Sequence, residues 1–483
     1  MKLGPFTFGY NATEDKGRRQ APRKRIYREE KVLTDVKRKK LIATTQDQVR
    51  NLTLVPWMVR KHLDYTANHH FEFKTGNDKL DATVNRIFKW HGRPENFDFM
   101  GRFGRDEFFR LFELEKVVSG DAAMIKLQGQ KLQAIESDEI RLCSDMPDIK
   151  LANGASISDS GIVVDAQGRP IGYSICRRTD SGGYEFDHIE PSENVIFDGY
   201  WSRYKSQYRG VSPLAASVNT VQDLYEALEF NLIKAKMHAL FGLAITRDPN
   251  DDEGGFGGAG GSTAEVSDAE AQDNGSHLDL NVRAVNILDM NPGDKVQVIE
   301  SGTPSSEFID ASYLYIQLGM LALDIPVTCF DSRRSSFSAR IADLNEYEVS
   351  CEPKRTKNRY VRMAYSDWLL RTIWNDPSSA WPLRALATEA GMGLRDVQSE
   401  VHWIASGSPW LDKYKQILGD ELGIALGLDN GIDAARRRGM DIFENIDKQS
   451  KVIEYAKAKG VPLKTGAMSD RVAIESISKD GEE

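Results

Sequence analysis

Cysteine is scarce in this sequence, and the few cysteines present are not spaced as metal or redox motifs. The four are Cys143, Cys176, Cys329 and Cys351, and no CxxC or CxxxC pair occurs among them. Small disulfide frameworks and structural zinc sites are recognised by such close spacing. We therefore expect reduced structural thiols, with no metal site and no redox chemistry.

Long apolar runs are also missing. Stretches such as LFGLAI are far shorter than the ~20 residues that a membrane-spanning helix needs. The beginning of the chain, MKLGPFTFGYNATEDKGRRQ, has no apolar block of the kind found in signal peptides. We expect a soluble protein made in the cytosol, with no membrane among its partners.

The common catalytic motifs are absent as well. The sequence has no GxxxxGK[ST] phosphate loop, no HExxH, no DxDxDG calcium loop and no GxSxG elbow. GGFGGAGG lacks the strand and helix that would make it a nucleotide site, and His69-His70 lacks a further ligand at useful spacing, which favours surface or packing histidines. We predict no catalytic residue, no cofactor and no metal, so the chain is not expected to be an enzyme; the missing phosphate loop also argues against a packaging ATPase.

Charge is present in two opposed blocks. Residues 1–40 contain 13 basic and 5 acidic residues, whereas residues 248–310 contain 2 basic and 14 acidic ones, within a net charge of -9. Because residues 1–40 are so highly charged, we expect them to form a mobile arm that runs into a helix near Glu29. The arm either solubilises the protein or contacts an anionic or protein surface.

The acidic block opens with a carboxylate cluster in a glycine-rich stretch, formed by Asp248, Asp251, Asp252 and Glu253. Such a cluster suggests a divalent-cation site, and a magnesium-dependent DNA-processing nuclease is the enzymatic alternative. Crowded carboxylates in a glycine-rich loop more often repel one another and remain solvated. A long exposed loop is therefore the favoured interpretation, with the nuclease kept as an alternative.

Length and pattern predict a multi-domain α+β protein. The chain has 483 residues, 40% of them apolar, which is enough for several cores. A buried helix is expected first, followed by two β-hairpins with glycine-containing turns and then by one more strand. Further along the chain, short strands are expected around an Asn-Pro-Gly-Asp turn. The corresponding stretches are AAMIKLQGQKLQAIE, GIVVDAQGRPIGYSICRR, NVIFDGYW, FDFMGRFGRDEFFRLFELEKVV and LDLNVRAVNILDMNPGDKVQVIE.

Several helices are predicted in the second half. Ser212-Pro213 offers a cap and a first-turn proline for one long helix reaching about Ala244, with an apolar stripe of Leu214, Val218, Val221, Tyr225, Leu228 and Leu232. A second apolar helix covers SSEFIDASYLYIQLGMLALD. A third begins near Phe337 and should be interrupted or kinked at Pro353 before resuming. Short helices are expected from Asp376 onward.

Six strings, in their order along the chain, resemble the lambda-type family of tailed-bacteriophage portal proteins. They span about residues 117–447, and their order rather than any one string makes the likeness specific. The strings are VVSGDAAMIK, GIVVDAQGRPIGYSI, SQYRGVSPLAASVNTVQDLYEALEFNLIKAKMHALFGLAI, LDMNPGDKVQVIES, LALDIPVTCFDSRRSSFSARIADLNEYE and PWLDKYKQILGDELGIALGLDNGIDAARRRGMDIFENID.

The resemblance implies a portal fold with long stem helices, a small β-rich clip, β-rich wing parts and a mostly helical crown. Its expected layout is a basic arm (1–40), wing (41–210), first stem helix (211–244), clip with the acidic glycine-rich insertion (245–304), second stem helix (305–324), tunnel loop and tunnel helix (325–375), and wing and crown helices with a tail (376–483).

The resemblance also implies a function. The expected protein is a homo-oligomeric ring, usually a dodecamer, assembled in the host cytoplasm and held at one capsid vertex of the virion. Double-stranded DNA would pass through it during packaging and ejection. Its expected partners are the terminase large subunit, the major capsid protein and scaffold, and a head–tail adaptor. A different head–tail adaptor ring remains an alternative, although adaptors are usually much shorter chains.

Within that layout, the stretch DSRRSSFSARIADLNEYE would enter the tunnel helix. The residues expected to face DNA are Arg333, Arg334, Ser335, Ser336 and Arg340, while Phe337, Ile341 and Leu344 would pack the helix against its neighbours. The other reading is that the arginines pair with acidic residues of the adjacent subunit. The residues expected to face the terminase and connector are Asp251, Asp252, Glu253, Asp279 and Arg283.

Overall fold

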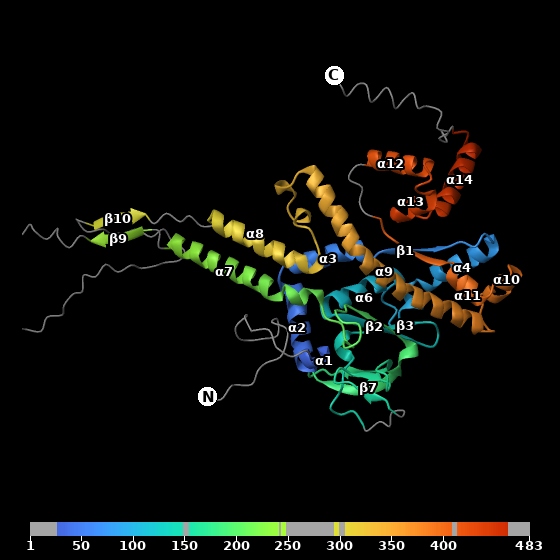
Figure 1. Ribbon diagram of the computed structural model, residues 1–483, viewed down its shortest axis with the longest axis horizontal. Helices are drawn as coiled ribbons and strands as arrows, with labels where there is room; N and C mark the ends of the chain where they lie inside the picture. The colour runs from blue at the N-terminus through green and yellow to red at the C-terminus, as the bar shows by residue number, and fades with distance from the viewer. Residues whose placement is uncertain are drawn as a thin grey trace, which may run out of the picture. The chain divides into compact units, whose positions relative to one another are not determined.

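The computed structural model describes residues 27–147, 154–240, 243–247, 294–298, 305–407 and 413–461 (Figure 1). The chain divides into two units, each with its own internal packing. Unit 1 comprises Met1–Val218 and Met320–Glu483, and unit 2 comprises Asn219–Gly319. Helices and strands mix in unit 1, as the predicted α+β class requires.

The first part of unit 1 is mainly helical and leads into two small sheets. Its helices are α1 (Glu29–Val32), α2 (Asp35–Asn51), α3 (Leu54–Thr66), α4 (Asp78–His91), α5 (Pro94–Phe97) and α6 (Arg105–Ser119). The two hairpin predictions are confirmed, since β2 (Asp121–Lys126) pairs antiparallel with β3 (Leu132–Ile135), and β5 (Ile162–Val164) with β6 (Pro170–Arg178). Strand β8 (Val195–Gly199) lies beside β2 and completes the first sheet. Strands β4 (Ser156–Ile157) and β7 (Tyr184–Pro191) pair with β5 and β6 and complete the second sheet. Two short 3-10 helices, η2 (Ser137–Glu139) and η3 (Ser192–Asn194), also belong to this part of the chain.

Helix α9 (Phe337–Asn375) connects the parts of unit 1, and its second half is buried in the main core. Tyr365 lies at the centre of an aromatic cluster, with ring centroids 5.3 Å from Phe97 and 5.6 Å from Phe109. Beyond α9 follow α10 (Leu383–Glu389), α11 (Leu394–Ser399), β11 (Val401–Ala405), α12 (Lys413–Ala425), α13 (Gly431–Arg437) and α14 (Ile442–Lys459).

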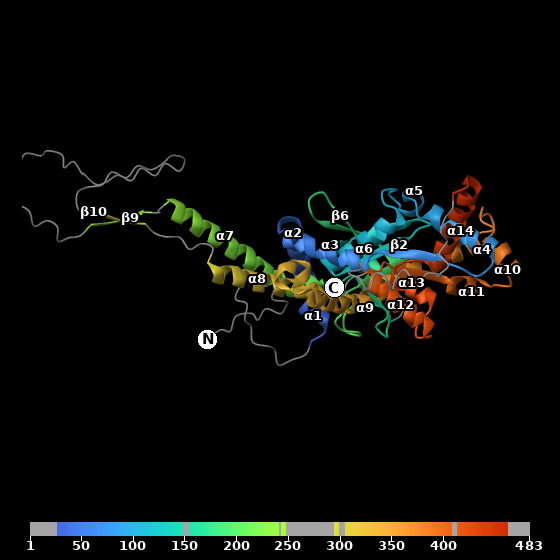
Figure 2. The ribbon, with the colours of Figure 1, turned by 90° about the horizontal axis from the view of Figure 1, so that it is seen from above.

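The antiparallel ribbon of β1 (His69–Phe73) and β11 joins residues more than three hundred positions apart. The sequence pattern missed both strands, because each is short and carries polar or aromatic residues rather than a clear alternation. The ribbon packs against α9 through Trp403, whose indole N–H donates to Ser366 Oγ at 3.0 Å. Figure 2 shows α9 and the C-terminal helices from above.

The helix predicted to start at Ser212-Pro213 forms in two pieces. Ser212 Oγ accepts a hydrogen bond from Leu214 N–H at 3.1 Å, as an N-cap should, but the first turn is the 3-10 helix η4 (Pro213–Ala216). Helix α7 (Val218–Leu240) follows. The expected extension to Ala244 is wrong, because Leu243–Arg247 forms strand β9, which pairs antiparallel with β10 (Asp294–Val298).

The second apolar helix is α8 (Ser306–Met320), continued by the 3-10 turn η5 (Leu321–Leu323). The third helix is not interrupted at Pro353: α9 is one helix of 39 residues with this proline inside it. Proline removes a single helix hydrogen bond, and the buried side chains of Cys351 and Arg355 hold the helix on both sides of it.

The predicted helix near Glu29 is confirmed, and the ordered part of the basic block extends through residues 27–40. These residues form α1 and the first turns of α2, and Arg38 is buried. Its guanidinium lies 3.0 Å from the carboxylate of Asp121, which also pairs with Arg209 at 2.9 Å. A charged side chain can be buried when it is paired and hydrogen-bonded, and here the partners come from β2 and from the segment before η4.

The expectation of four reduced thiols is also wrong. Cys143 and Cys176 form a disulfide that links the segment after η2 to β6, and only Cys329 and Cys351 are free. Spacing along the chain did not indicate the bridge because the two cysteines are 33 residues apart. They become neighbours only when the hairpin of β5 and β6 folds back.

Candidate functional site: the loop before α9 and the groove beside it

The loop between α8 and α9 is built from short turns. After η5 come the 3-10 helices η6 (Val327–Cys329) and η7 (Ser332–Arg334). The Asp331 carboxylate accepts a hydrogen bond from Arg333 N–H at 3.0 Å, and Ser336 Oγ accepts one from Ala339 N–H at 3.2 Å. Ser336 is therefore the N-cap of α9, as its position before an apolar periodic stretch predicts.

The predicted DNA-facing residues lie together on this loop and on the first turn of α9. Arg333 is 90% exposed in its side chain, with Nε 3.2 Å from Asp331 Oδ1 of the same chain. Arg340 and Ser336 are exposed, Ser335 Oγ donates to Ser332 O at 3.3 Å, and Arg334 ends η7. An exposed ion pair contributes about 1 kcal/mol or less to stability. Asp331 therefore orients the Arg333 side chain but leaves it able to contact another molecule. Their contact with DNA stays a prediction.

A second feature anchors this loop, and sequence reasoning missed it. Asp324 adopts a left-handed backbone conformation with φ of 60°, and its carboxylate lies 2.7 Å from Lys354 Nζ of α9. Aspartate is one of the few side chains that tolerates this conformation at a helix end. The sequence signal was the Asp that directly follows LAL at the end of the helix.

A groove of about 980 Å³ lies beside the first half of α9. One wall is the apolar face Phe337, Ile341 and Leu344, and the other walls come from β11 and α13. Phe337 is 60% exposed, whereas Ile341 and Leu344 are half-buried, so the chain itself covers only part of the face that was predicted to pack this helix against its neighbours.

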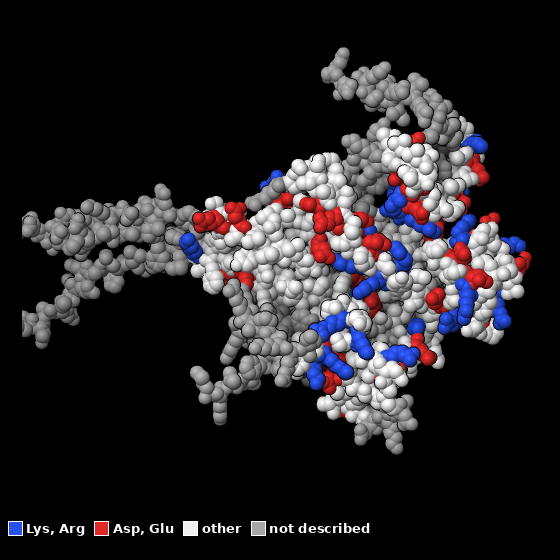
Figure 3. Space-filling view, in the orientation of Figure 1, with Lys and Arg blue, Asp and Glu red and all other residues white. Residues whose placement is uncertain are grey.

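The charges that line the groove are already paired. Arg355, at its floor, pairs with Glu348, and its Nε donates to Tyr65 O at 2.6 Å. Burial lowers the pKa of Arg355, but the hydrogen bond and charge of Glu348 outweigh burial and raise it. On the opposite wall Arg437 pairs with Asp429, and Arg438 with Asp420. Figure 3 shows basic and acidic side chains mixed around α9 and α13. Such a mixture of positive and negative charge does not make an anion-binding site.

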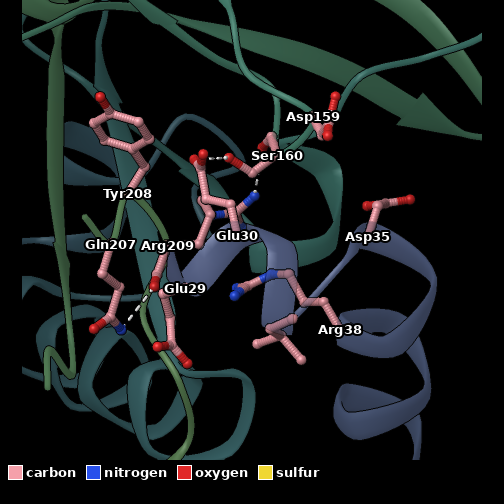
Figure 4. A pocket seen from close by; sticks show the side chains of 10 residues that line it. Glu29, Glu30, Asp35, Arg38, Asp159, Ser160, Gln207, Tyr208 and Arg209 are labelled. Atoms are coloured by element: carbon pink, nitrogen blue, oxygen red, sulfur yellow. Dashed lines mark hydrogen bonds between the residues drawn. The ribbon is translucent and has the colours of Figure 1, made fainter. Parts of the chain in front are cut away.

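A smaller hollow lies where α1 and α2 meet the segment before η4 (Figure 4). Its volume is about 20 Å³, room for about one water molecule. Glu30 accepts a hydrogen bond from Ser160 Oγ at 3.3 Å, and burial raises the pKa of this carboxyl. The hollow joins parts of unit 1 and is too small for a ligand.

The predicted clip residues lie outside the described residues: Asp251, Asp252, Glu253, Asp279 and Arg283. The acidic cluster of the nuclease alternative lies there too. Within the described ranges, no three His, Cys, Asp or Glu side chains are grouped as metal ligands. In the same part of the chain, no helix is both long and apolar enough to cross a membrane. His69 is a packing histidine, buried with Nε2 3.3 Å from Arg355 O.

Comparison with known proteins identifies the family. The family model described as "Phage portal protein, lambda family" matches residues 16–347, about two thirds of the chain. The chain therefore belongs to the lambda family of phage portal proteins, a structural family. The match includes the loop before α9 and ends within that helix.

Comparison with solved structures finds chains of gene transfer agent particles at low similarity. A chain of "Virion of native gene transfer agent (GTA) particle" is 13% identical, with a TM-score of 0.42, covering 83% of this chain and 93% of that one. A chain of "Neck of native GTA particle computed with C12 symmetry" is 14% identical, with a TM-score of 0.40, covering 82% and 93%. No curated protein that was compared matches the chain.

Proposed function

We propose that this protein forms a ring channel at one vertex of a capsid, through which double-stranded DNA enters during packaging and leaves at infection. Membership of the lambda portal family is the observation that carries this proposal. In it the terminase large subunit and later a head–tail connector dock on the ring, and the major capsid protein and scaffold surround it. The expected ring is a dodecamer assembled in the host cytoplasm.

The proposal gives each part of the chain a role in the ring. Helices α7 and α8 act as the stem, the region between them as the clip, and the loop 325–336 with α9 as tunnel loop and tunnel helix. The helices and small sheets of 41–210 form the wing, and the helices from 376 onward form wing and crown.

Exposed apolar side chains on α7 and α8 support assembly. On α7, Phe230 is 68% exposed and Leu232 54%, and on α8 Leu314 is 54% exposed. Scattered apolar residues on a surface are ordinary, but a contiguous apolar surface marks a contact with another molecule. Neighbouring copies in a ring would cover these helices.

Charge gives the tunnel loop its proposed role. Each phosphate neutralised by a cation adds affinity through counterion release, and repetition around a ring multiplies the effect. A channel that passes DNA therefore benefits from few cations on its wall. We propose that Arg333 and Arg334 provide a small number of contacts that retain the packaged end.

Mass photometry of the purified protein, followed by negative-stain averaging, tests the ring. We expect a species near twelve subunits with an axial hole. A strict monomer at every salt concentration, also after addition of scaffold and capsid protein, would contradict the channel.

The double variant Arg333→Ala, Arg334→Ala tests the tunnel loop. We expect rings of unchanged mass and a several-fold loss of retained DNA in packaged particles, because the phosphate contacts are gone. Arg86→Ala with Lys89→Ala, two exposed side chains of α4, is the control. If the tunnel-loop variant instead fails to form rings, the arginines serve contacts between subunits.

A further inference from the structure

The carboxyl groups of α1 and of the start of α2 are engaged with unit 1 itself. Glu29, Glu30 and Asp35 all line the small hollow (Figure 4). Glu29 is buried, and the Asp35 carboxylate pairs with Arg141 at 2.6 Å. Because the acidic side chains are used on the inner side of α1, its outer side is left with cations.

That outer side is basic. The exposed charged side chains of α1 and of the residue before it are Arg28 and Lys31. The loop that follows β8 adds Arg203 and Lys205, which are both exposed. Figure 3 shows Lys and Arg side chains gathered where Figure 1 places α1. We name these four residues, together with Tyr204 between the last two, the α1 surface.

The loop after β8 is held in one shape and is tied to α1. The side-chain carbonyl of buried Gln207 accepts hydrogen bonds from Ser202 N–H and Arg203 N–H, both at 3.0 Å. Arg203 Nη1 donates to Tyr27 O at 3.0 Å, and Arg203 Nε lies 3.3 Å from the carboxylate of Glu29. A loop ordered in advance loses less entropy when it binds a partner. The α1 surface is therefore preorganised.

The side chains on this surface have the chemistry of phosphate contacts. Tyr204 is fully exposed and has an exposed cation on either side of it in sequence, Arg203 and Lys205. Arginine, lysine and the tyrosine hydroxyl are among the usual donors to phosphate and sugar oxygens in protein–DNA complexes. The α1 surface thus offers four cations and one phenol hydroxyl to a polyanion.

The sequence before α1 continues the same charge. Residues 16–25 contain six basic residues and no acidic one. Double-stranded DNA carries one negative charge about every 1.7 Å along its axis, so it can engage a run of cations all along its length. Folded protein surfaces usually mix charges of both signs. A run of this kind therefore fits DNA better than it fits an acidic protein.

We propose that the α1 surface, together with the basic segment before it, binds the phosphate backbone of double-stranded DNA. It is built on α1 and the loop after β8, and so it is a different site from Arg333 and Arg334 before α9. Contacts to phosphates carry no sequence information, so binding is independent of DNA sequence. The charge argument holds without a ring, whereas the choice of double-stranded DNA among polyanions rests on the proposed function.

Fluorescence anisotropy of a labelled duplex of about 30 base pairs, titrated with the full-length protein at several salt concentrations, tests the α1 surface. The variant Arg28→Ala, Lys31→Ala, Lys205→Ala leaves Arg203 in place, because its pair with Glu29 holds the loop. We expect about tenfold weaker binding. The slope of log affinity against log salt should become shallower by about 2–3, since each lost phosphate contact removes about 0.9 from it.

A matched control removes three cations from another part of unit 1. Lys79→Ala, Arg86→Ala, Lys89→Ala changes exposed side chains of α4 and alters the net charge by the same amount. It should bind DNA as the parent protein does. Tyr204→Phe loses a hydrogen bond and no charge, so it should weaken binding a few-fold with the salt slope unchanged.

The outcomes separate the α1 surface from the channel. No binding by the parent protein at low salt would overturn the proposal, and so would equal losses in the α1 and α4 variants, because net charge would then be the cause. Equal affinity for polyglutamate would overturn it too, since the partner would then be an acidic protein. Binding lost only in Arg333→Ala, Arg334→Ala would overturn the α1 surface and leave the channel standing. Loss in the α1 variant of a protein that never forms rings would overturn the channel alone.

Discussion

At the scale of single residues, unit 1 holds several ionisable groups away from water. Lys116 is buried and paired with Glu113 at 2.7 Å and Asp198 at 2.5 Å. Burial alone raises the pKa of Glu113, but Lys116 and His62 outweigh it and lower the pKa far below its ordinary value. Such pairs specify how α6 and β8 meet, because breaking one leaves an uncompensated buried charge.

Glu115 is the contrary case, since burial, together with the nearby carboxylates of Glu136 and Asp138, raises its pKa from 4.5 to about 7. The folded protein therefore resists ionisation of this carboxyl, and stability falls as the pH rises from about 4.5 to 7 and stays lower above. Glu115→Gln should keep the acceptor for Ser137 N–H, which lies 3.1 Å away. We expect a gain of roughly 1–3 kcal/mol in the free energy of unfolding at pH 8, and little change at pH 4.

Urea unfolding at both pH values measures this difference. Glu107→Gln, on the exposed side of the same helix, is the control and should change stability little at either pH. An equal effect of Glu115→Gln at pH 4 and pH 8 would mean that ionisation is not its cause.

At the scale of elements, α9 combines two different halves in one helix. The half after Pro353 is held by the main core, and the half before it lines the groove and follows the loop 325–336. The proline lies on the exposed side, where its ring meets solvent. The interruption expected from the sequence does not occur because tertiary contacts on both sides outweigh one lost hydrogen bond.

Pro353→Ala should stabilise the protein. Alanine restores the backbone donor and removes the ring clash, and interior prolines cost about 3 kcal/mol relative to alanine. We expect an increase of about 1–3 kcal/mol in the free energy of unfolding, measured in urea. Pro213→Ala, at the first position of η4 where proline is favourable, should give no increase. A loss of stability in Pro353→Ala would show that the helix depends on the proline.

The Cys143–Cys176 bridge predicts that the sheet of β4, β5, β6 and β7 responds to reductant. It closes a long segment of chain, and such bridges contribute about 2–4 kcal/mol. Reduction, or Cys143→Ser, should lower the melting temperature and expose the β5–β6 hairpin to hydrogen exchange. Cys329→Ser is the control, because that thiol is free. Titration of four thiols in denaturant without reductant would contradict the bridge.

At the scale of the whole molecule, the exposed apolar side chains of α7 and α8 are a feature that a single chain leaves unsatisfied. Phe230→Asp with Leu232→Asp on α7 places carboxylates where neighbouring stem helices would meet. We expect at least a tenfold loss of rings by mass photometry, since charges buried at an interface without partners are costly. Tyr204→Asp, an exposed tyrosine of the wing, should assemble normally. Undiminished rings in the α7 variant would show that the stem does not hold the subunits together.

The sequence by itself determined the family, both hairpins and the apolar helices, because these depend on local periodicity, turn residues and the order of strings along the chain. Tertiary structure alone decided the β1–β11 ribbon, the Cys143–Cys176 bridge and the burial of Arg38 against Asp121. These features join residues far apart in sequence, and no local pattern encodes which distant partner a short strand, a thiol or a charge will meet. For the same reason, the continuity of α9 through Pro353 emerged only from the packing.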